Sequence, residues 1–169
     1  MTRHPKLTRR QALSLGSAAL AGLAFARPAI SLAGASELPL ITKPIPSTGE
    51  TLPVIGVGTN AFGTEDPDAL ARIRGVLETL PQLGGRVVDT AQSYGRSEAV
   101  IGQLVQGIGN RESLFIATKT ASRGRVSMAD IDAAFARLGV ERIDLLQVHN
   151  FNETDAVMPM MLELKAQGR

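Results

Sequence analysis

The order of structural elements is clearest in residues 86–119, which read RVVDTAQSYGRSEAVIGQLVQGIGNRESLFIATK. The two valines within residues 86–89 and the apolar run at residues 114–118 both predict short strands. Between them, residues 97–108 predict a helix, with Ser97 as its N-cap and an acidic residue in its first turn. A strand, a helix and a second strand in this order are typical of two parallel strands in one sheet.

The alternation of strands and helices extends toward the N-terminus. Residues 54–58 predict a short buried strand. A helix is expected to follow, with Asp66 as its N-cap, Pro67 at its first position and the glycine pair at 84–85 after its end. Before the strand, the prolines and the Ser-Thr-Gly-Glu cluster within residues 44–50 predict the turn of a β-hairpin.

Two further elements are predicted after residue 119. Ser127 and Asp130 form a capping-box pattern that begins a helix, and Gly139 ends this helix. Residues 143–148 are almost continuously apolar, as expected of a buried parallel strand. Four strands that alternate with helices predict an α/β fold with a parallel sheet, either open or closed into a barrel.

The last predicted helix lies close to the end of the sequence. It runs from about Met158 to Gln167, with Pro159 at its start. A closed eight-stranded barrel takes about 250 residues, whereas this sequence contains four strand–helix units. We therefore expect the hairpin and the first four units of a (β/α)8 barrel, in a domain that stops about halfway.

The composition excludes several classes of protein. With 44% hydrophobic and 20% charged residues, the 169-residue chain is too apolar to be disordered. It contains no cysteine, which excludes disulfides, a thiol nucleophile, zinc–thiolate sites and iron–sulfur clusters. Residues 1–35 contain five basic and no acidic side chains, so the rest of the chain has a net charge of −3. This balance does not favour a nucleic-acid partner, and no metal site is predicted.

Residues 1–35 have the features of an export signal. Two arginines at residues 9–10 precede residues 12–26, which are small or apolar but too few to span a bilayer. Residues 33–35, Ala-Gly-Ala, match the small-x-small pattern after which signal peptidases cut. The segment around the two arginines resembles the twin-arginine signal of bacterial Tat substrates. The resemblance implies a periplasmic or exported protein with no stable membrane anchor, whose mature domain is residues 36–169. The alternative is that the N-terminal segment is not a signal but an amphipathic first helix of the domain.

Polar or ionisable side chains follow three consecutive predicted strands. They are Asp89, Lys119 and His149, and Tyr94 stands five residues after Asp89 in the intervening loop. Because active sites of parallel α/β sheets lie at the carboxyl ends of the strands, we expect these four side chains to lie close together. A tyrosine has an ordinary pKa of about 10 and is a poor acid at neutral pH, but a nearby ammonium favours the phenolate. The pattern predicts an acid–base site, although each residue alone has an ordinary structural interpretation.

Four segments surround these side chains in the sequence: residues 56–60, 88–98, 116–119 and 144–149. In these segments the sequence resembles the aldo/keto reductase family. The resemblance covers about residues 40–169. It implies a TIM barrel that reduces a small carbonyl substrate, an aldehyde or a ketone, to an alcohol with NAD(P)H.

The resemblance also implies roles for individual residues. Tyr94 would protonate the carbonyl oxygen, and His149 would hydrogen-bond the same oxygen. Lys119 would favour the phenolate form of the tyrosine, and Asp89 would orient the lysine. The residues that would contact the cofactor, either NADP(H) or NAD(H), are Gly58, Thr59, Asn60 and Asp89. Most cofactor contacts are expected in the second half of the barrel.

Two alternatives remain open. Residues 56–61 fit the dinucleotide-binding pattern G-x-G-x-x-A, with Asp89 placed to contact a ribose. However, residues 62–65 separate that pattern from the next helix, and a Rossmann domain would leave the tyrosine, lysine and histidine of the strand ends without a role. The second alternative is a non-catalytic half-barrel, either inert or a binding module that needs a second chain. Self-association of two copies would cover both open edges of such a half-barrel.

Overall fold

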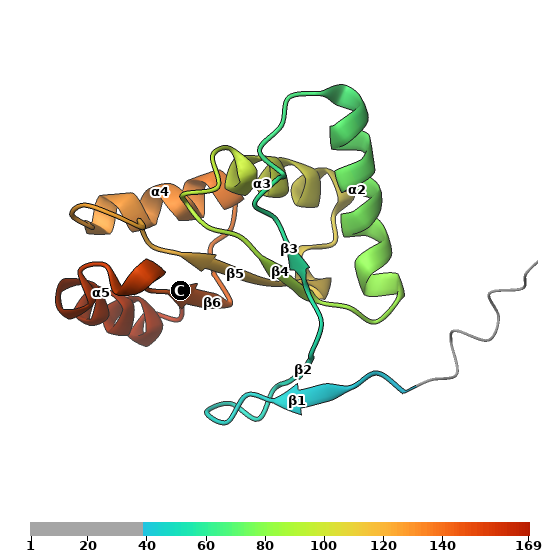
Figure 1. The fold of residues 1–169 in the computed structure, drawn as a ribbon. Coiled ribbons are helices and arrows are strands. Elements are labelled where there is room, and N and C mark those ends of the chain that lie inside the picture. Colours follow the sequence, from blue (N-terminus) through green and yellow to red (C-terminus); the bar gives the residue numbers. More distant parts are fainter. Residues whose placement is uncertain (1–38) are drawn as a thin grey trace, which may run out of the picture. The chain divides into compact units, whose positions relative to one another are not determined.

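The computed structural model describes residues 39–169, and the predicted signal peptide at residues 1–35 lies outside this range. The described chain contains a two-stranded antiparallel sheet and a four-stranded parallel sheet (Figure 1). Its strands are β1 (Thr42–Pro44), β2 (Thr51–Pro53), β3 (Val57–Gly58), β4 (Val87–Asp89), β5 (Phe115–Lys119) and β6 (Leu145–Gln147). Its α-helices are α2 (Pro67–Gln82), α3 (Ser97–Ile108), α4 (Met128–Leu138) and α5 (Thr154–Ala166), and short 3-10 helices occur at Arg111–Ser113 and His149–Phe151.

The parallel sheet follows the order of the chain, β3-β4-β5-β6. A helix follows each of its strands, and the predicted α/β fold with a parallel sheet is confirmed. The antiparallel sheet is the predicted hairpin, in which β1 pairs with β2 so that Thr42 lies opposite Pro53.

The register of the parallel sheet determines which side chains meet at its carboxyl edge. Gly58 of β3 pairs with Asp89 of β4, and Asp89 pairs with Ala117 of β5. Strand β5 continues for two more residues, so that Lys119 pairs with Gln147 of β6. The side chain of Lys119 therefore starts two residues beyond the level of Asp89, from the neighbouring strand.

Helix boundaries agree with several of the predicted signals. Asp66 precedes α2 and accepts a hydrogen bond from the N–H of Asp68 at 3.1 Å. Helix α4 begins with the predicted capping box, in which Ser127 and Asp130 bind each other's backbone N–H groups. It ends at Gly139, whose φ of 64° is the left-handed conformation that favours glycine.

Helices α2, α3 and α4 lie along one face of the parallel sheet, as Figure 1 shows. Helices α3 and α4 pack closely at Gly102, where a β-carbon would lie 2.4 Å from the carbonyl oxygen of Arg137. The absence of a side chain at Gly102 makes this approach possible. The largest fully buried apolar side chains of this layer include Leu77, Ile101, Leu114, Ile116, Ile131 and Leu138. The burial of each such side chain contributes about 1.5–3 kcal/mol to the stability of the fold. This packed layer therefore holds in place the strands whose carboxyl ends lead into the loops.

Two predicted strands differ from the structure. The strand expected at residues 54–58 contains only its last two residues, because the N–H of Val54 donates to the carbonyl oxygen of Ile41 at 3.0 Å and so continues the hairpin. Val54 and Ile55 are 43% and 76% exposed, and the prediction of a buried strand is wrong for them. Strand β6 covers only Leu145–Gln147 of the predicted residues 143–148, and Leu145 is 44% exposed. Leu145 pairs with Ala117 and so lies on the sheet face opposite to Thr118, whose hydroxyl binds Glu98 of α3.

The last helix begins earlier than predicted. Helix α5 starts at Thr154 rather than near Met158, and Pro159 lies inside it rather than at its start. The hydroxyl of Thr154 donates to the carbonyl oxygen of Phe151 at 2.8 Å, which ties the first turn to the preceding loop. A proline inside a helix removes one backbone hydrogen bond, and this helix tolerates that loss.

No helix within residues 39–169 is long and apolar enough to cross a membrane. In the same range, no group of three or more histidine, aspartate or glutamate side chains is arranged to hold a metal ion.

Candidate active site

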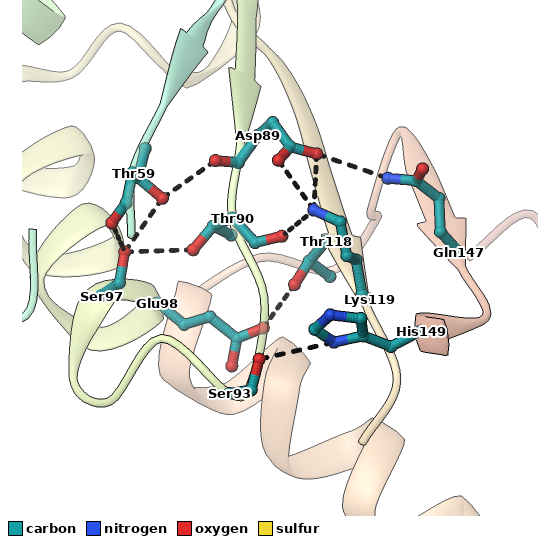
Figure 2. Close-up of polar contacts among 10 residues, drawn as sticks. All are labelled: Thr59, Asp89, Thr90, Ser93, Ser97, Glu98, Thr118, Lys119, Gln147 and His149. Carbon is teal, nitrogen blue, oxygen red and sulfur yellow. Dashed lines mark hydrogen bonds and ion pairs between the residues drawn. The ribbon is translucent and has the colours of Figure 1, made fainter. Parts of the chain in front are cut away.

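The ammonium group of Lys119 is held by three acceptors at the end of β4. Its Nζ lies 2.7 Å from Oδ1 and 2.7 Å from Oδ2 of Asp89, and 2.8 Å from the carbonyl oxygen of Thr90 (Figure 2). An ammonium has three hydrogens to donate, so these contacts use its full capacity. The lysine side chain is 16% exposed and that of Asp89 is 40% exposed, which leaves the pair open to solvent on one side.

Tyr94 and His149 complete the predicted set of four. The Nζ of Lys119 lies 5.4 Å from the centre of the Tyr94 ring. The rings of Tyr94 and His149 have centres 6.4 Å apart and are nearly perpendicular, at 89°. The structure thus brings Asp89 and these three residues together at one edge of the sheet.

The loop that carries Tyr94 is a tight turn. The N–H of Tyr94 donates to the carbonyl oxygen of Ala91 at 3.0 Å, and its own carbonyl accepts from the N–H of Ser97 at 3.1 Å. Gly95 has a φ of 61°, a conformation that side chains disfavour. The loop after β3 packs against this turn, since a β-carbon at Gly63 would lie 3.0 Å from the carbonyl oxygen of Tyr94.

A hollow of about 530 Å³ lies between these two loops. Its lining consists of Asn60, Ala61, Gly63, Ser93, Tyr94 and Gly95. Of the predicted cofactor residues, Asn60 therefore faces the same space as the tyrosine. Gly58 is exposed at the end of β3, and Asp89 is engaged with the lysine.

Thr59 differs from the other predicted cofactor residues because it is fully buried. Its hydroxyl donates to the carbonyl oxygen of Asp89 at 2.9 Å. Its side chain is therefore engaged within the protein, and a cofactor contact by Thr59 stays a prediction.

Ser97 does not cap α3, contrary to the prediction. Arg96 occupies the N-cap position without a side-chain capping bond, and Ser97 is the first helical residue. The Ser97 hydroxyl is buried and donates instead to the carbonyl oxygen of Thr59 at 2.9 Å. The prediction failed because a serine at a helix start can satisfy either its own helix or a neighbouring loop, and the sequence pattern is the same in both cases.

Glu98, the next residue, is a buried carboxylate that is 1% exposed. Its Oε1 accepts from the hydroxyl of Thr118 at 2.6 Å, and its Oε2 accepts from Nε of Arg137 at 2.7 Å. Since Thr118 directly precedes Lys119, this contact fixes the end of β5 to α3 and α4.

Two further residues contact this set, although the sequence pattern did not predict them. Nε2 of Gln147 donates to Oδ1 of Asp89 at 3.4 Å, and the Ser93 hydroxyl lies 3.4 Å from Nδ1 of His149. Gln147 could have been found, because it is a polar residue near the end of the strand predicted at residues 143–148, at the same edge of the sheet as Asp89. Ser93 offered no comparable signal beyond its position next to Tyr94.

The loop after β6 has an uncommon backbone. Asn150, Phe151 and Glu153 have φ values of 54°, 56° and 53°, in the left-handed region that non-glycine residues rarely adopt. Asn152 anchors this loop, since its Nδ2 donates to the carbonyl oxygens of Ala121 at 3.2 Å and Gly124 at 2.8 Å. Such strain persists where surrounding contacts impose it, and it is concentrated at functional sites.

The fold and the site define a class of protein: an α/β domain with an aspartate, a tyrosine, a lysine and a histidine at the carboxyl edge of its parallel sheet. The model of the aldo/keto reductase family matches residues 54–169. The chain belongs to the aldo/keto reductase family, and its fold is of the TIM-barrel type.

Individual relatives agree with this assignment. The chain is 31% identical over 125 residues to aldo-keto reductase YhdN of Bacillus subtilis, in a match covering 62% of this chain and 36% of YhdN. It resembles the solved structure of an aldo-keto reductase from Pseudomonas aeruginosa with a TM-score of 0.64 and 30% identity, over 76% of this chain and 56% of that one. It also resembles an aldo-keto reductase of Bombyx mori in complex with NADP, with a TM-score of 0.51 and 25% identity, over 66% and 38% of the two chains.

The chain is short relative to these proteins. It spans 36–39% of the length of YhdN and of two mycobacterial aldo-keto reductases that match it.

Proposed function

We propose that the chain carries the acid–base site of an NAD(P)H-dependent reductase that converts an aldehyde or ketone to an alcohol. The observation that carries the proposal is the position of the Lys119 ammonium, bound by Asp89 and 5.4 Å from the centre of the Tyr94 ring. Membership of the aldo/keto reductase family and the likeness to a structure with bound NADP support it.

In this proposal Tyr94 is the proton donor. Its phenol gives a proton to the carbonyl oxygen of the substrate, and the positive charge of Lys119 stabilises the phenolate that remains. Asp89 holds the ammonium in place through both of its carboxylate oxygens. The proton goes to the oxygen as the carbonyl carbon is reduced, so the product is a neutral alcohol.

His149 donates a hydrogen bond to the same carbonyl oxygen. The Ser93 hydroxyl lies 3.4 Å from Nδ1 of the imidazole. When Ser93 donates to Nδ1, the ring hydrogen of a neutral imidazole is on Nε2, which is then the donor toward the substrate. Such a donor stabilises the negative charge that develops on the oxygen.

A nicotinamide cofactor, when bound, would supply the hydride. The residues present fit one end of such a group, because Asn60 and Tyr94 line one hollow of about 530 Å³. The side chain of Asn60 has both a donor and an acceptor, and Gly58, two residues before it, is exposed. These residues would hold the cofactor beside the tyrosine.

The proposal is tested by an assay of the purified protein with small aldehydes and ketones. Oxidation of NADPH and of NADH is followed by the loss of their absorbance, and cofactor binding is measured separately by fluorescence titration. Carbonyl-dependent oxidation that Tyr94→Phe abolishes supports the proposal. Cofactor oxidation that does not depend on the carbonyl compound, or that Tyr94→Phe leaves unchanged, contradicts it.

A second candidate is a binding module that a second copy of the chain completes. It is favoured by a cavity of about 700 Å³ between the hairpin, the end strand β6 and helix α5. Apolar residues that line it include Ile45, Leu52, Phe115, Leu146 and Met161. An apolar cavity beside an open strand edge is a surface on which another chain can pack.

We also propose that the protein is exported by the Tat pathway and that residues 36–169 are the mature domain. This proposal is supported by the two arginines at residues 9–10, the mild apolar run after them and the Ala-Gly-Ala sequence at residues 33–35. Tat transport carries folded proteins, which suits a domain that binds its cofactor before export.

A further inference from the structure

Three buried hydroxyl groups connect the loop after β3 with the end of β4 and the start of α3. They belong to Thr59, Thr90 and Ser97, and none of these residues is exposed. Oγ of Ser97 lies 2.9 Å from the carbonyl oxygen of Thr59, 3.0 Å from its Oγ1 and 3.1 Å from Oγ1 of Thr90 (Figure 2). The three side chains therefore form one hydrogen-bonded cluster, which we call the hydroxyl cluster.

The hydroxyl cluster binds the peptide group that joins Asp89 to Thr90. The carbonyl oxygen of Asp89 accepts two hydrogen bonds from Thr59, one from its N–H at 3.1 Å and one from its hydroxyl at 2.9 Å. On the other side of the peptide, the N–H of Thr90 donates to the carbonyl oxygen of Ala117 at 2.8 Å. The peptide is thus fixed from both neighbouring strands.

The position of the Lys119 ammonium depends on this peptide. Its three acceptors are the two carboxylate oxygens of Asp89 and the carbonyl oxygen of Thr90, so all of them belong to the two residues that the peptide joins. A rotation at this point would move the acceptors and the ammonium together. It would also change the distance between the ammonium and the Tyr94 ring.

We infer that Thr59 is a positioning residue, whose hydroxyl, held by Ser97, fixes the Asp89–Thr90 segment and through it the Lys119 ammonium beside Tyr94. The inference rests on the proposed function, because it concerns the same proton donor. It gives Thr59 a role through its side chain that needs no contact with a cofactor. Valine has nearly the same shape as threonine but no hydroxyl, so Thr59→Val would leave Asp89 with one donor fewer and Ser97 with one acceptor fewer.

The chain offers a direct readout of this geometry. It contains one tyrosine and no tryptophan. The change in ultraviolet absorbance as the phenol becomes phenolate at high pH therefore reports on Tyr94 alone, and it requires neither cofactor nor substrate. Removing a neighbouring positive charge disfavours the phenolate and moves the transition to higher pH.

The experiment compares the absorbance transition in four variants of the whole chain with that of the wild type. Lys119→Met should move the absorbance transition to higher pH, and the size of this shift is the reference for the other variants. Thr59→Val should move the transition in the same direction by a smaller amount. Thr59→Ser keeps the hydroxyl, so its transition should lie at the wild-type pH. Ser127→Ala is the matched control, because it removes a serine hydroxyl that binds Asp130 at the start of α4, whereas Lys119 binds Asp89 and Thr90. It should leave the transition unchanged.

A transition that Lys119→Met moves and Thr59→Val does not move overturns the inference and leaves the proposed function standing. A transition that Lys119→Met itself fails to move overturns both the inference and the proposed coupling of lysine to tyrosine. If Ser127→Ala shifts the transition as much as Thr59→Val does, the shift reflects a general loss of stability, and this result also overturns the inference. Circular dichroism checks that each variant is folded. If Thr59→Val does not fold, Ser97→Ala takes its place, and it is expected to shift the transition in the same direction.

Discussion

Nζ of Lys119 lies 2.7 Å from both carboxylate oxygens of Asp89, although the two residues belong to neighbouring strands and to different levels of the sheet. Asp89 pairs with Ala117, two residues before Lys119. The lysine side chain therefore folds back toward β4, and its ammonium comes to lie 5.4 Å from the Tyr94 ring centre. The extra length of β5 at the carboxyl edge is what makes this contact possible.

Replacing Tyr94 by phenylalanine should abolish carbonyl reduction. The change keeps the ring and removes the one group proposed to donate the proton, which is worth about 10²–10⁴-fold in rate for a general acid. Steady-state assays should show the loss in kcat, while titration shows cofactor binding close to that of the wild type. Turnover near the wild-type value would mean that another group supplies the proton.

Replacing Glu98 by alanine should lower the free energy of unfolding by about 1–3 kcal/mol. The carboxylate is 1% exposed, and its loss would leave the buried Thr118 hydroxyl without an acceptor and Arg137 without its ion pair. Urea unfolding followed by circular dichroism measures the change.

The matched control for this prediction is Glu78→Ala. Glu78 pairs with Arg74 at 3.1 Å on the surface of α2, where the two side chains are 42% and 40% exposed. Exposed pairs of this kind are worth about 0–1 kcal/mol. Equal destabilisation by the two substitutions would contradict the structural importance of the buried Glu98.

Three of the four site residues could be predicted from the sequence for a simple physical reason, and Tyr94 stands in the short loop after one of them. In a parallel sheet, every strand ends at the same edge, so polar residues at strand ends are neighbours whatever the exact register. The sequence positions of Asp89, Lys119 and His149 were therefore enough to predict that their side chains meet. Gln147 could have been added in the same way, because it too is a polar residue near the carboxyl end of its strand.

The supporting contacts could not be predicted in this way. Ser97 and Glu98 begin a helix in the sequence pattern, but their side chains bind Thr59, Thr118 and Arg137, which belong to other elements. These partners are 38, 20 and 39 residues distant along the chain, so local patterns contain no signal for them. The same holds for the short β3, whose preceding residues are drawn into the hairpin by one tertiary hydrogen bond.

The capping box of α4 should make stability depend on pH in the acid range. The hydroxyl and then the backbone N–H of Ser127 donate to the Asp130 carboxylate and hold the pKa of Asp130 below its ordinary value of 3.8. A carboxyl whose pKa is lowered by folding stabilises the folded chain above its unfolded pKa. This contribution is lost as the pH falls through the folded pKa.

The measurement is urea unfolding of the wild type and of Asp130→Asn, between about pH 5 and about pH 3. The wild type should lose more stability over this interval than the variant, whose side chain does not titrate. Ser127→Ala, which removes the largest cause of the lowered pKa, should reduce the difference. Parallel pH profiles for wild type and Asp130→Asn would contradict the prediction.

Replacing both arginines at positions 9 and 10 by lysine should retain the protein in the cytoplasm. The Tat resemblance depends on the pair, whereas the net charge of the segment is unchanged by the substitution. Cell fractionation with detection of the precursor and of the chain shortened at residue 35 measures the effect. Arg3→Lys keeps the pair and should be exported normally, while normal export of the double variant would exclude the Tat assignment.

Residues 36–169 on their own should self-associate rather than behave as a monomer. In the described sheet β3 and β6 each have one neighbour, so each presents unpaired backbone groups along its other side. Exposed apolar side chains lie next to both edges, with Ile55 76% exposed before β3 and Leu145 44% exposed in β6. A second copy that pairs with these edges would satisfy the backbone groups and bury the apolar side chains in one step.

Light scattering at several protein concentrations tests this last prediction. The average mass should rise with concentration, and Leu145→Lys should reduce it, because a charged side chain on an edge strand opposes pairing with another chain. Glu112→Lys is the matched control, since it makes a charge change of the same sign at an exposed site outside both edges. A wild-type monomer at all concentrations that melts sharply would contradict the prediction, and it would mean that the open edges of this sheet are protected without a partner.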